Sequence, residues 1–139
     1  MTEKDLWLYR DTLERMYAAA ERLREYENIL SSPMAPKLGE IRGNTYDSDR
    51  MSPAVSYLDK LRAEKERTEA EHIKAREIMD RVCDMLPHTT ERQVVDLRYK
   101  QAWEWEDIAI FMKLARASVY RIRRRILDDI SGIDINKLA

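Results

Sequence analysis

The N-terminal part of the chain carries a heptad-like pattern of apolar residues. Between residues 2 and 30 the apolar positions recur at alternating steps of three and four residues, and Glu27 is the one polar interruption. Thr2 followed by Asp5 is typical of a helix start. The pattern predicts one helix over 2–30 whose apolar stripe packs against a partner helix, in this chain or in another. The stripe consists of Leu6, Tyr9, Leu13, Met16, Ala20, Leu23 and Leu30.

A second long helix is predicted over 54–86, after a segment that has no apolar period. Residues 31–53 hold three of the four prolines and two of the three glycines, which predicts a linker or a long loop. The centre of the second helix is very polar with alternating charge, so we expect ion pairs along it. Residues 2–30 and 54–86 should form an antiparallel hairpin or a dimeric coiled coil. The apolar side of the second helix is Leu58, Leu61, Ile73, Ile78, Val82 and Met85.

The two histidines and the single cysteine have no partners at metal-ligand spacing. His72 lies in the polar centre of the second helix and is expected in solvent, and His88 follows Pro87 and is expected in a loop. Cys83 has apolar neighbours and should be a small buried residue. The sequence therefore predicts no metal site, and a single cysteine allows no disulfide within the chain.

After residue 86 the pattern changes to shorter helices that are separated by polar breaks. Thr90 and Gln93 have the spacing of a capping box, which predicts a helix start at Thr90. A break is expected at 100–102. Trp103 and Trp105 follow the break, and we expect them to close a small C-terminal core.

Residues 105–127 have the spacing of a helix-turn-helix. The first of its two helices follows a cap at Glu104, and the turn falls at 113–115. Ala109 is small at the point where the two helices would cross. One apolar face of the pair consists of Ile108, Met112, Leu114, Val119 and Ile122.

The positive charge of the chain is concentrated in the second of these helices. The whole chain has 25 Lys and Arg against 26 Asp and Glu, a net charge of −1, yet six basic residues and no acid lie between Lys113 and Arg125. Residues 87–139 carry a net charge of +2, whereas 1–53 and 54–86 carry −2 and −1. A helix that enters a DNA groove lies among phosphates, which favours arginine and excludes acids. The asymmetry favours a C-terminal nucleic-acid-binding module.

The segment TERQVVDLRYKQAWEWEDIAIFMKLARASVYRIRRRIL resembles region four of bacterial sigma factors, the part that reads the upstream promoter element. Lys113 stands where that family usually has glycine, at a turn position that often needs a positive φ. Ala115 stands where the family usually has serine, so the second helix lacks that side-chain cap. The matching features are Thr90–Arg92, Leu97–Tyr99, Glu106–Ala109, and Arg116–Val119 followed by a basic helix.

The layout of the whole chain is similar to that of small phage transcriptional regulators of the ArpU and RinA type. These proteins are encoded by phages and prophages of Gram-positive bacteria and are associated with late-gene control. The likeness lies in a long N-terminal helix, a loop with proline and glycine, a second charged helix and a sigma-like C-terminal module. It implies a DNA-binding regulator.

The resemblance and the charge pattern together predict that the second helix, residues 115–127, reads the major groove of DNA. Its base-reading residues should lie off the side formed by Val119, Ile122 and Ile126. We expect base contacts from Arg116, Ala117, Tyr120, Arg121 and Arg124, and phosphate contacts from Arg98, Lys113, Arg123 and Arg125.

The sequence therefore predicts an all-α protein with three parts. Residues 1–86 form a helical hairpin or coiled coil for oligomerisation, 87–130 a helix-turn-helix domain similar to sigma region four, and 131–139 a tail. The predicted function is that of a sequence-specific regulator that binds double-stranded DNA as a homodimer. Two alternatives remain open: a module that binds a protein such as RNA polymerase, or the small subunit of a phage terminase. A dimer would favour the regulator and a large ring the terminase.

No class of enzyme fits the sequence. It has no Gly-rich phosphate loop, no metal-ligand cluster and no Ser/His/Asp or Cys/His set at a suitable spacing, so we expect no cofactor. The N-terminus does not resemble a signal peptide, and no apolar run reaches the length of a membrane span. We expect a cytoplasmic protein without a membrane segment.

Overall fold

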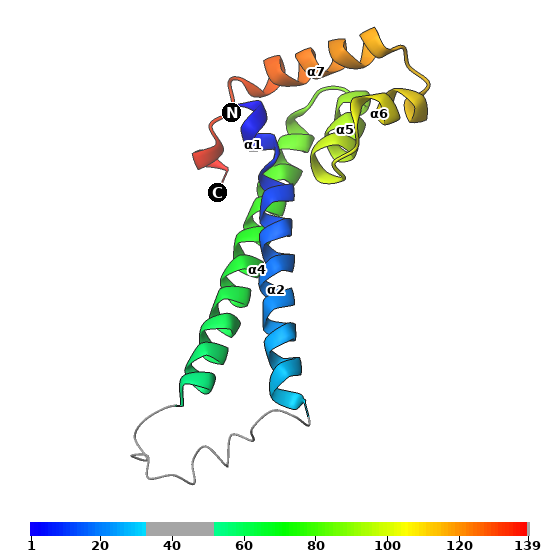
Figure 1. The fold of residues 1–139 in the computed structure, drawn as a ribbon. Helices are drawn as coiled ribbons and strands as arrows, with labels where there is room; N and C mark the ends of the chain where they lie inside the picture. The colour runs from blue at the N-terminus through cyan, green and yellow to red at the C-terminus, as the bar shows by residue number, and fades with distance from the viewer. Residues whose placement is uncertain (33–51, 139) are drawn as a thin grey trace, which may run out of the picture. The chain divides into compact units, whose positions relative to one another are not determined.

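The computed structural model describes residues 1–32 and 52–138, and its regular structure there is entirely helical (Figure 1). The predicted all-α class is confirmed for this part of the chain. Most of the predicted linker, residues 33–51, lies outside the described residues. The helices are α1 (Glu3–Leu6), α2 (Leu8–Ser31), α4 (Pro53–Met85), α5 (Thr89–Val95), the π-helical turn η1 (Asp96–Lys100), α6 (Trp105–Met112), α7 (Arg116–Ile130) and the 3₁₀ turn η2 (Ile135–Lys137).

The chain divides into two compact units. The larger unit comprises Met1–Leu13 together with Glu71–Ala139, and the helix-pair unit comprises Glu14–Ala70. Helices α2 and α4 each contribute residues to both units. This division differs from the one expected at residue 86, because the C-terminal helices bury apolar side chains against the first residues of the chain and the end of α4.

In the helix-pair unit, α2 and α4 run antiparallel (Figure 1). Leu23 of α2 packs with Leu58 and Leu61 of α4 in a small buried cluster. Beside this cluster, the Nη2 of Arg22 donates to the Oε1 of Glu64 at 2.7 Å. The apolar stripe of the first long helix thus finds its partner helix within the same chain.

The core of the larger unit draws on segments that are far apart in the sequence. Leu6 of α1 is fully buried together with side chains from α4, α5, η1, α6 and α7. Two positions expected on the apolar side of α4 lie in solvent instead, since Ile73 and Met85 are exposed. The large apolar side chains that are fully buried are Leu6, Met79, Val82, Leu86, Val94, Val95, Tyr99, Ile108, Val119, Ile126 and Ile130.

The prediction that His72 lies in solvent is wrong. The residue is 8% exposed and its Nδ1 lies 3.0 Å from the Oγ1 of Thr12 on α2. Its ring also meets the ring of Tyr9 edge-on, with 4.8 Å between the centroids. His72 lies three residues before the buried Ala75, so both lie on the same side of α4, although the nearby Glu71 and Lys74 are charged.

Acid is expected to destabilise the larger unit through His72. Burial lowers the pKa of His72, and the nearby charge of Arg76 lowers it further, so the folded state favours the neutral ring. Above the unfolded pKa of about 6.5 the ring is neutral in both states, and the folded state keeps its full stability. As the pH falls below that value, the unfolded chain binds the proton more readily and the free energy of unfolding decreases. His72→Gln should remove this part of the pH dependence in denaturation experiments between about pH 5 and pH 8. The exposed His88→Gln is the matched control, and identical pH profiles for His72→Gln and the wild type would contradict the assignment.

Helix α5 begins differently from the prediction. Its first residue is Thr89 and its N-cap is His88, whose side chain makes no capping hydrogen bond. The capping box predicted at Thr90 and Gln93 is therefore wrong. Thr90 lies in the first turn of the helix instead, one residue past its start.

The two helices predicted after the break are present with the turn between them. Helix α6 follows an N-cap at Glu104, as expected. Lys113 ends α6 with φ 56° and ψ 43°, the left-handed conformation that glycine adopts most easily. The N–H of Leu114 donates to the carbonyl of Ala109 at 2.9 Å, and Ala115 is the N-cap of α7 without a side-chain hydrogen bond. Ala109 is buried, which is consistent with a close approach of α6 and α7.

Candidate nucleic-acid interface

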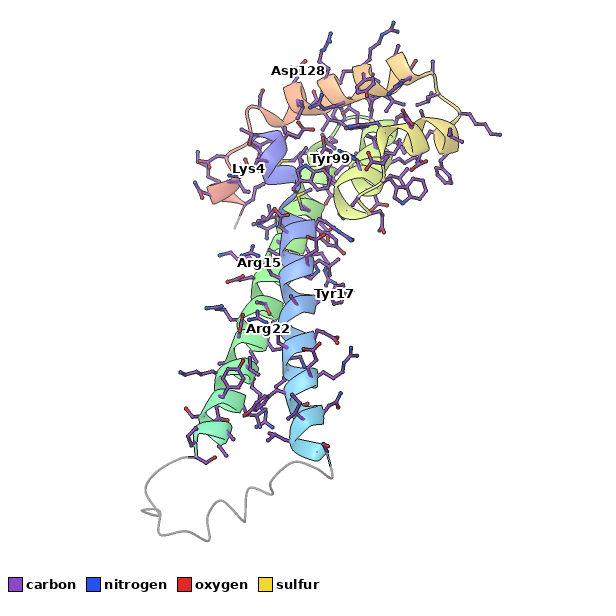
Figure 2. All side chains as sticks on the ribbon, viewed as in Figure 1. Lys4, Arg15, Tyr17, Arg22, Tyr99 and Asp128 are labelled. Carbon is purple, nitrogen blue, oxygen red and sulfur yellow. The ribbon has the colours of Figure 1, made fainter. Side chains whose placement is uncertain are left out.

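Helix α7 turns one side to the core and the opposite side to solvent. Val119, Ile122, Ile126 and Ile130 are buried on the inner side. Figure 2 shows side chains with nitrogen tips that project from α7 away from α5 and α6. We call the exposed set of residues the basic face of α7; it consists of Arg116, Ala117, Tyr120, Arg121, Arg124 and Arg125.

The centre of the basic face is a single stripe along the helix. Ala117, Arg121, Arg124 and Asp128 are exposed and follow one another at steps of four, three and four residues, which places them on one side of α7. Asp128, labelled in Figure 2, is the first acid of the helix. The positive part of the stripe therefore ends before Asp128.

Arg116 lies at the edge of the basic face and has an acidic neighbour. Its Nη2 lies 3.0 Å from the Oε1 of Glu106 on α6, and both side chains are largely exposed. Exposed pairs of this kind contribute little to stability. The guanidinium of Arg116 can therefore leave Glu106 for a stronger anion at small cost.

Arg98, which the sequence predicts to bind phosphate, is held inside the larger unit. Its guanidinium carbon lies 5.1 Å from the ring centroid of Trp7 and 5.1 Å from that of Trp105. Its Nη1 donates to the carbonyl of Trp103 at 2.8 Å. Its contacts with two indole rings and its bond to the backbone allow Arg98 to link Trp7, which follows α1, to the start of α6.

Arg123, also predicted to bind phosphate, is bound to the N-terminal helix α1. Its Nε and Nη2 donate to the two carboxylate oxygens of Glu3 at 3.1 and 2.7 Å. The hydroxyl of Tyr99 donates to the Oε1 of Glu3 at 2.9 Å. The bond from Arg123 is the main reason why the pKa of Glu3 is lowered, while burial and Glu3 raise the pKa of Tyr99 above its usual range. The guanidinium groups of Arg98 and Arg123 are therefore bonded within the larger unit and do not belong to the basic face of α7.

The other two residues predicted to bind phosphate are accessible. Lys113 is exposed in the turn between α6 and α7. Arg125 is exposed on the flank of α7 that faces α5, and its Nε lies 3.9 Å from the Oε1 of Glu91. Both remain available to an anionic ligand.

A hollow of about 600 Å³ lies beside the basic face, between α5 and α7. It brings a side chain of α5 next to three arginines of α7. Thr90 and Ser118 contribute hydroxyls to it, and the sequence analysis assigns neither of them a contact with DNA. Spacing offers a signal for Ser118, which lies four residues before the buried Ile122 and so flanks the core side. The hollow is lined by Thr90, Leu114, Ser118, Arg121, Ile122, Arg124, Arg125 and Asp128.

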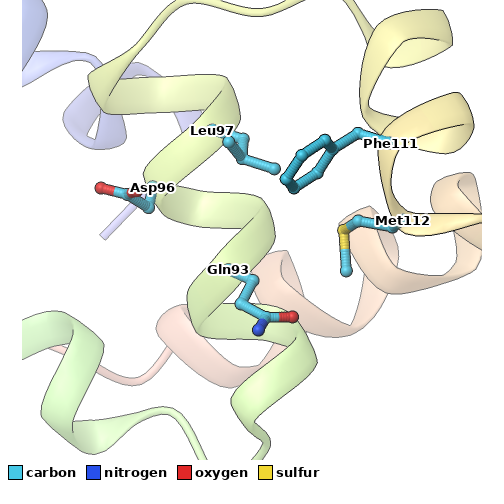
Figure 3. A pocket seen from close by; sticks show the side chains of 5 residues that line it. All are labelled: Gln93, Asp96, Leu97, Phe111 and Met112. Atoms are coloured by element: carbon cyan, nitrogen blue, oxygen red, sulfur yellow. The ribbon is translucent and has the colours of Figure 1, made fainter.

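A second hollow of about 490 Å³ lies between α6 and the α5–η1 segment (Figure 3). Figure 3 shows Phe111 pointing across it toward Leu97, with Met112 beside them. Phe111 is 65% exposed and the adjacent Ile110 is 76% exposed. The exposed apolar side chains of Ile110 and Phe111 lie outside the basic face, and Gln93 and Asp96 add polar groups to the hollow.

No family model matches the chain, and no curated protein or solved structure is detectably similar to it.

Within residues 1–32 and 52–138, no group of three or more His, Cys, Asp or Glu side chains is placed to hold a metal ion. None of the helices described there is long and apolar enough to cross a membrane. Cys83 is partly buried against the core, and burial raises the pKa of its thiol.

Glu91 of α5 is a fully buried carboxylate behind the basic face. Neither of its oxygens accepts a hydrogen bond from the described residues. Burial raises the pKa of Glu91 to about 7; the Asp129 carboxylate also raises it, and Arg125 lowers it. The folded state therefore favours the protonated form of Glu91.

Replacing Glu91 by glutamine is expected to stabilise the larger unit at alkaline pH. In the wild type, the preference for a protonated Glu91 supports folding fully below pH 4.5, and this support is lost as the pH rises through about 7. At about pH 8 the variant should gain roughly 1–3 kcal/mol in free energy of unfolding, with little change at about pH 4.5. Chemical denaturation at both pH values measures this, with the exposed Glu77→Gln as the control. An equal effect of Glu91→Gln at both pH values would contradict the assignment.

Proposed function

We propose that the chain binds double-stranded DNA through the basic face of α7 and acts as a sequence-specific transcription regulator. The observation that carries this proposal is the amphipathic character of α7. One side is buried, and the other exposes four guanidinium groups with no acid before Asp128. An exposed basic helix after a three-residue turn has the arrangement with which helix-turn-helix proteins enter the major groove.

The parts of the basic face are assigned different contacts. Arg121, Arg124, Ala117 and Tyr120 lie toward its centre and are proposed to meet base edges, where arginine pairs with guanine and small apolar groups meet thymine methyls. Arg116 is also proposed to meet a base edge, after its ion pair with Glu106 breaks. Lys113 and Arg125 lie at the margins of the helix and are proposed to meet phosphates.

Selection from a random duplex library tests the proposal. We expect one enriched sequence, and an affinity that falls linearly with the logarithm of salt concentration as phosphate contacts release counterions. Binding that is equally strong for all sequences would exclude a sequence-specific regulator, and absence of binding would exclude the DNA function. Mapping of bound sites in the host genome then tests the further proposal of late-gene control in a phage or prophage.

We propose that two copies of the chain associate through the helix-pair unit. The apolar stripe of α2 packs against α4 of the same chain and is not available to a second copy. The association is supported instead by large side chains of the helix-pair unit that remain exposed, Tyr17, Ile29 and Tyr57. A two-fold dimer would place two basic faces on half-sites about one DNA turn, or a multiple of it, apart. Sedimentation should give a dimer that Tyr17→Glu with Ile29→Glu converts to a monomer of lower DNA affinity. A large ring would favour the terminase alternative.

The exposed apolar surface of α6 favours a second candidate function, the binding of a protein such as RNA polymerase. Exposed apolar patches on a folded chain often mark protein contacts. Replacing Ile110 and Phe111 together by serine should abolish binding to purified polymerase and leave DNA affinity unchanged. If the double variant still binds polymerase, Ile110 and Phe111 do not form the polymerase-binding surface.

A further inference from the structure

We infer that the hollow between α5 and α7 holds one sugar-phosphate unit of the DNA backbone, and that Thr90 and Ser118 bind its phosphate together with Arg125. This inference rests on the proposed DNA binding. The inference adds a specific phosphate site to the proposed DNA binding. It also assigns a role to Thr90 and Ser118, which lie outside the basic face.

The hydroxyls come from two different helices. Thr90 lies in the first turn of α5 and Ser118 in the first turn of α7, and both side chains line the same hollow. Within the described residues the structure gives neither hydroxyl a hydrogen-bond partner. Serine and threonine hydroxyls donate readily to phosphate oxygens, and most protein–DNA hydrogen bonds go to the backbone.

The charge of the hollow suits a single phosphate. Three guanidinium groups and one carboxylate line it, from Arg121, Arg124, Arg125 and Asp128. Arg121 and Arg124 belong to the central stripe of α7 and are the arginines proposed to meet base edges. Arg125 lies on the flank nearest α5, so its guanidinium is the one placed for the backbone, where arginine binds two phosphate oxygens at once.

The apolar part of the lining distinguishes a nucleotide unit from a free phosphate ion. Leu114 and Ile122 contribute aliphatic carbon to the hollow. A free phosphate ion would make no favourable apolar contact with these groups, whereas the C–H groups of a deoxyribose can pack on them. The lining therefore fits the alternating polar and apolar character of a DNA strand.

A site that joins α5 to α7 also has a mechanical consequence for recognition. A phosphate bound by Thr90 and Ser118 together would fix the depth and the angle of α7 in the groove, because its two hydroxyl donors belong to different helices. Contacts of this kind set the register of a protein on the duplex without reading sequence.

The test uses the full-length protein and the selected duplex, in which one phosphate at a time is replaced by a neutral methylphosphonate. For the wild type we expect one linkage flanking the major-groove contact whose neutralisation weakens binding roughly tenfold. Thr90→Val and Ser118→Ala should weaken binding to the unmodified duplex and lose the sensitivity to that linkage. Arg125→Gln should also lower the slope of log affinity against log salt by about one.

Thr89→Val is the matched control, since Thr89 is exposed one residue earlier and does not line the hollow. Thermal denaturation of each variant establishes that it is folded. Failure of the wild type to bind any duplex would overturn the proposed function itself. Specific binding by the wild type, with Thr90→Val and Ser118→Ala behaving like Thr89→Val at every linkage, would overturn the phosphate site and leave the DNA function standing.

Discussion

Arg121→Ala is expected to weaken binding to the selected duplex by about 1–3 kcal/mol and to relax base preference at one position of the site. Arg121 lies in the middle of the exposed stripe of α7, and its side chain is exposed whereas that of its neighbour Ile122 is buried. Within the described residues Arg121 has no ion pair, so its guanidinium is available to a base. Titration against the selected duplex and against each single-base variant of it measures both effects.

Variants of two other arginines distinguish a base contact from a phosphate contact and from a general effect of lost charge. Arg125→Ala should weaken binding to all sequences by about the same factor, because a phosphate contact carries no sequence information. Arg67→Ala, which removes an exposed arginine of α4 in the helix-pair unit, should leave DNA affinity unchanged. If Arg121→Ala is folded and binds the selected site as tightly as the wild type, α7 does not read bases through this residue.

Leu6→Asp is expected to lower the free energy of unfolding of the larger unit by about 3–5 kcal/mol. Leu6 is fully buried and belongs to the same apolar cluster as Val94, Ile108 and Ile126. An aspartate there would place a charge without a partner among these side chains. Chemical denaturation gives the loss of stability, and it should remove DNA binding as well, although Leu6 is remote in sequence from α7.

Lys4→Asp is the control for this variant, because it introduces the same side chain at an exposed position of the same helix. It should leave the denaturation midpoint nearly unchanged. A Leu6→Asp protein with the stability of Lys4→Asp would show that the C-terminal helices fold without the N-terminal segment, as the sequence-based division at residue 86 implies.

The elements that the sequence predicts well are those that local spacing determines. The recurrence of Ile108, Val119 and Ile122 is sufficient to locate α6, the turn and α7, because helical periodicity decides which side of each helix is buried. The same periodicity identifies the exposed arginines of α7. The left-handed turn at Lys113 also follows from its position between the two helices.

Contacts between remote segments account for what the sequence does not predict. Nothing near Arg123 or Arg98 in the chain indicates that Glu3 and Trp7 will bind them, since these partners come from the other end of the sequence. The burial of His72 is hidden for the same reason, because the partner Thr12 lies on another helix. Hydrophobic patterning identifies apolar faces, but it does not identify a polar residue whose partner lies far away in the chain.

The contacts of Arg98 with the indole rings of Trp7 and Trp105 make tryptophan fluorescence a probe of the larger unit. All three tryptophans, Trp7, Trp103 and Trp105, belong to the larger unit, and the segment Glu14–Ala70 contains none. Tryptophan fluorescence therefore follows the larger unit alone, whereas far-ultraviolet circular dichroism follows the helices of both units. Release of the N-terminal segment would free the indole of Trp7 from the guanidinium and change its emission before the long helices melt. Non-coincident unfolding curves from the two signals would resolve the two units as separate cooperative transitions within one unlabelled protein.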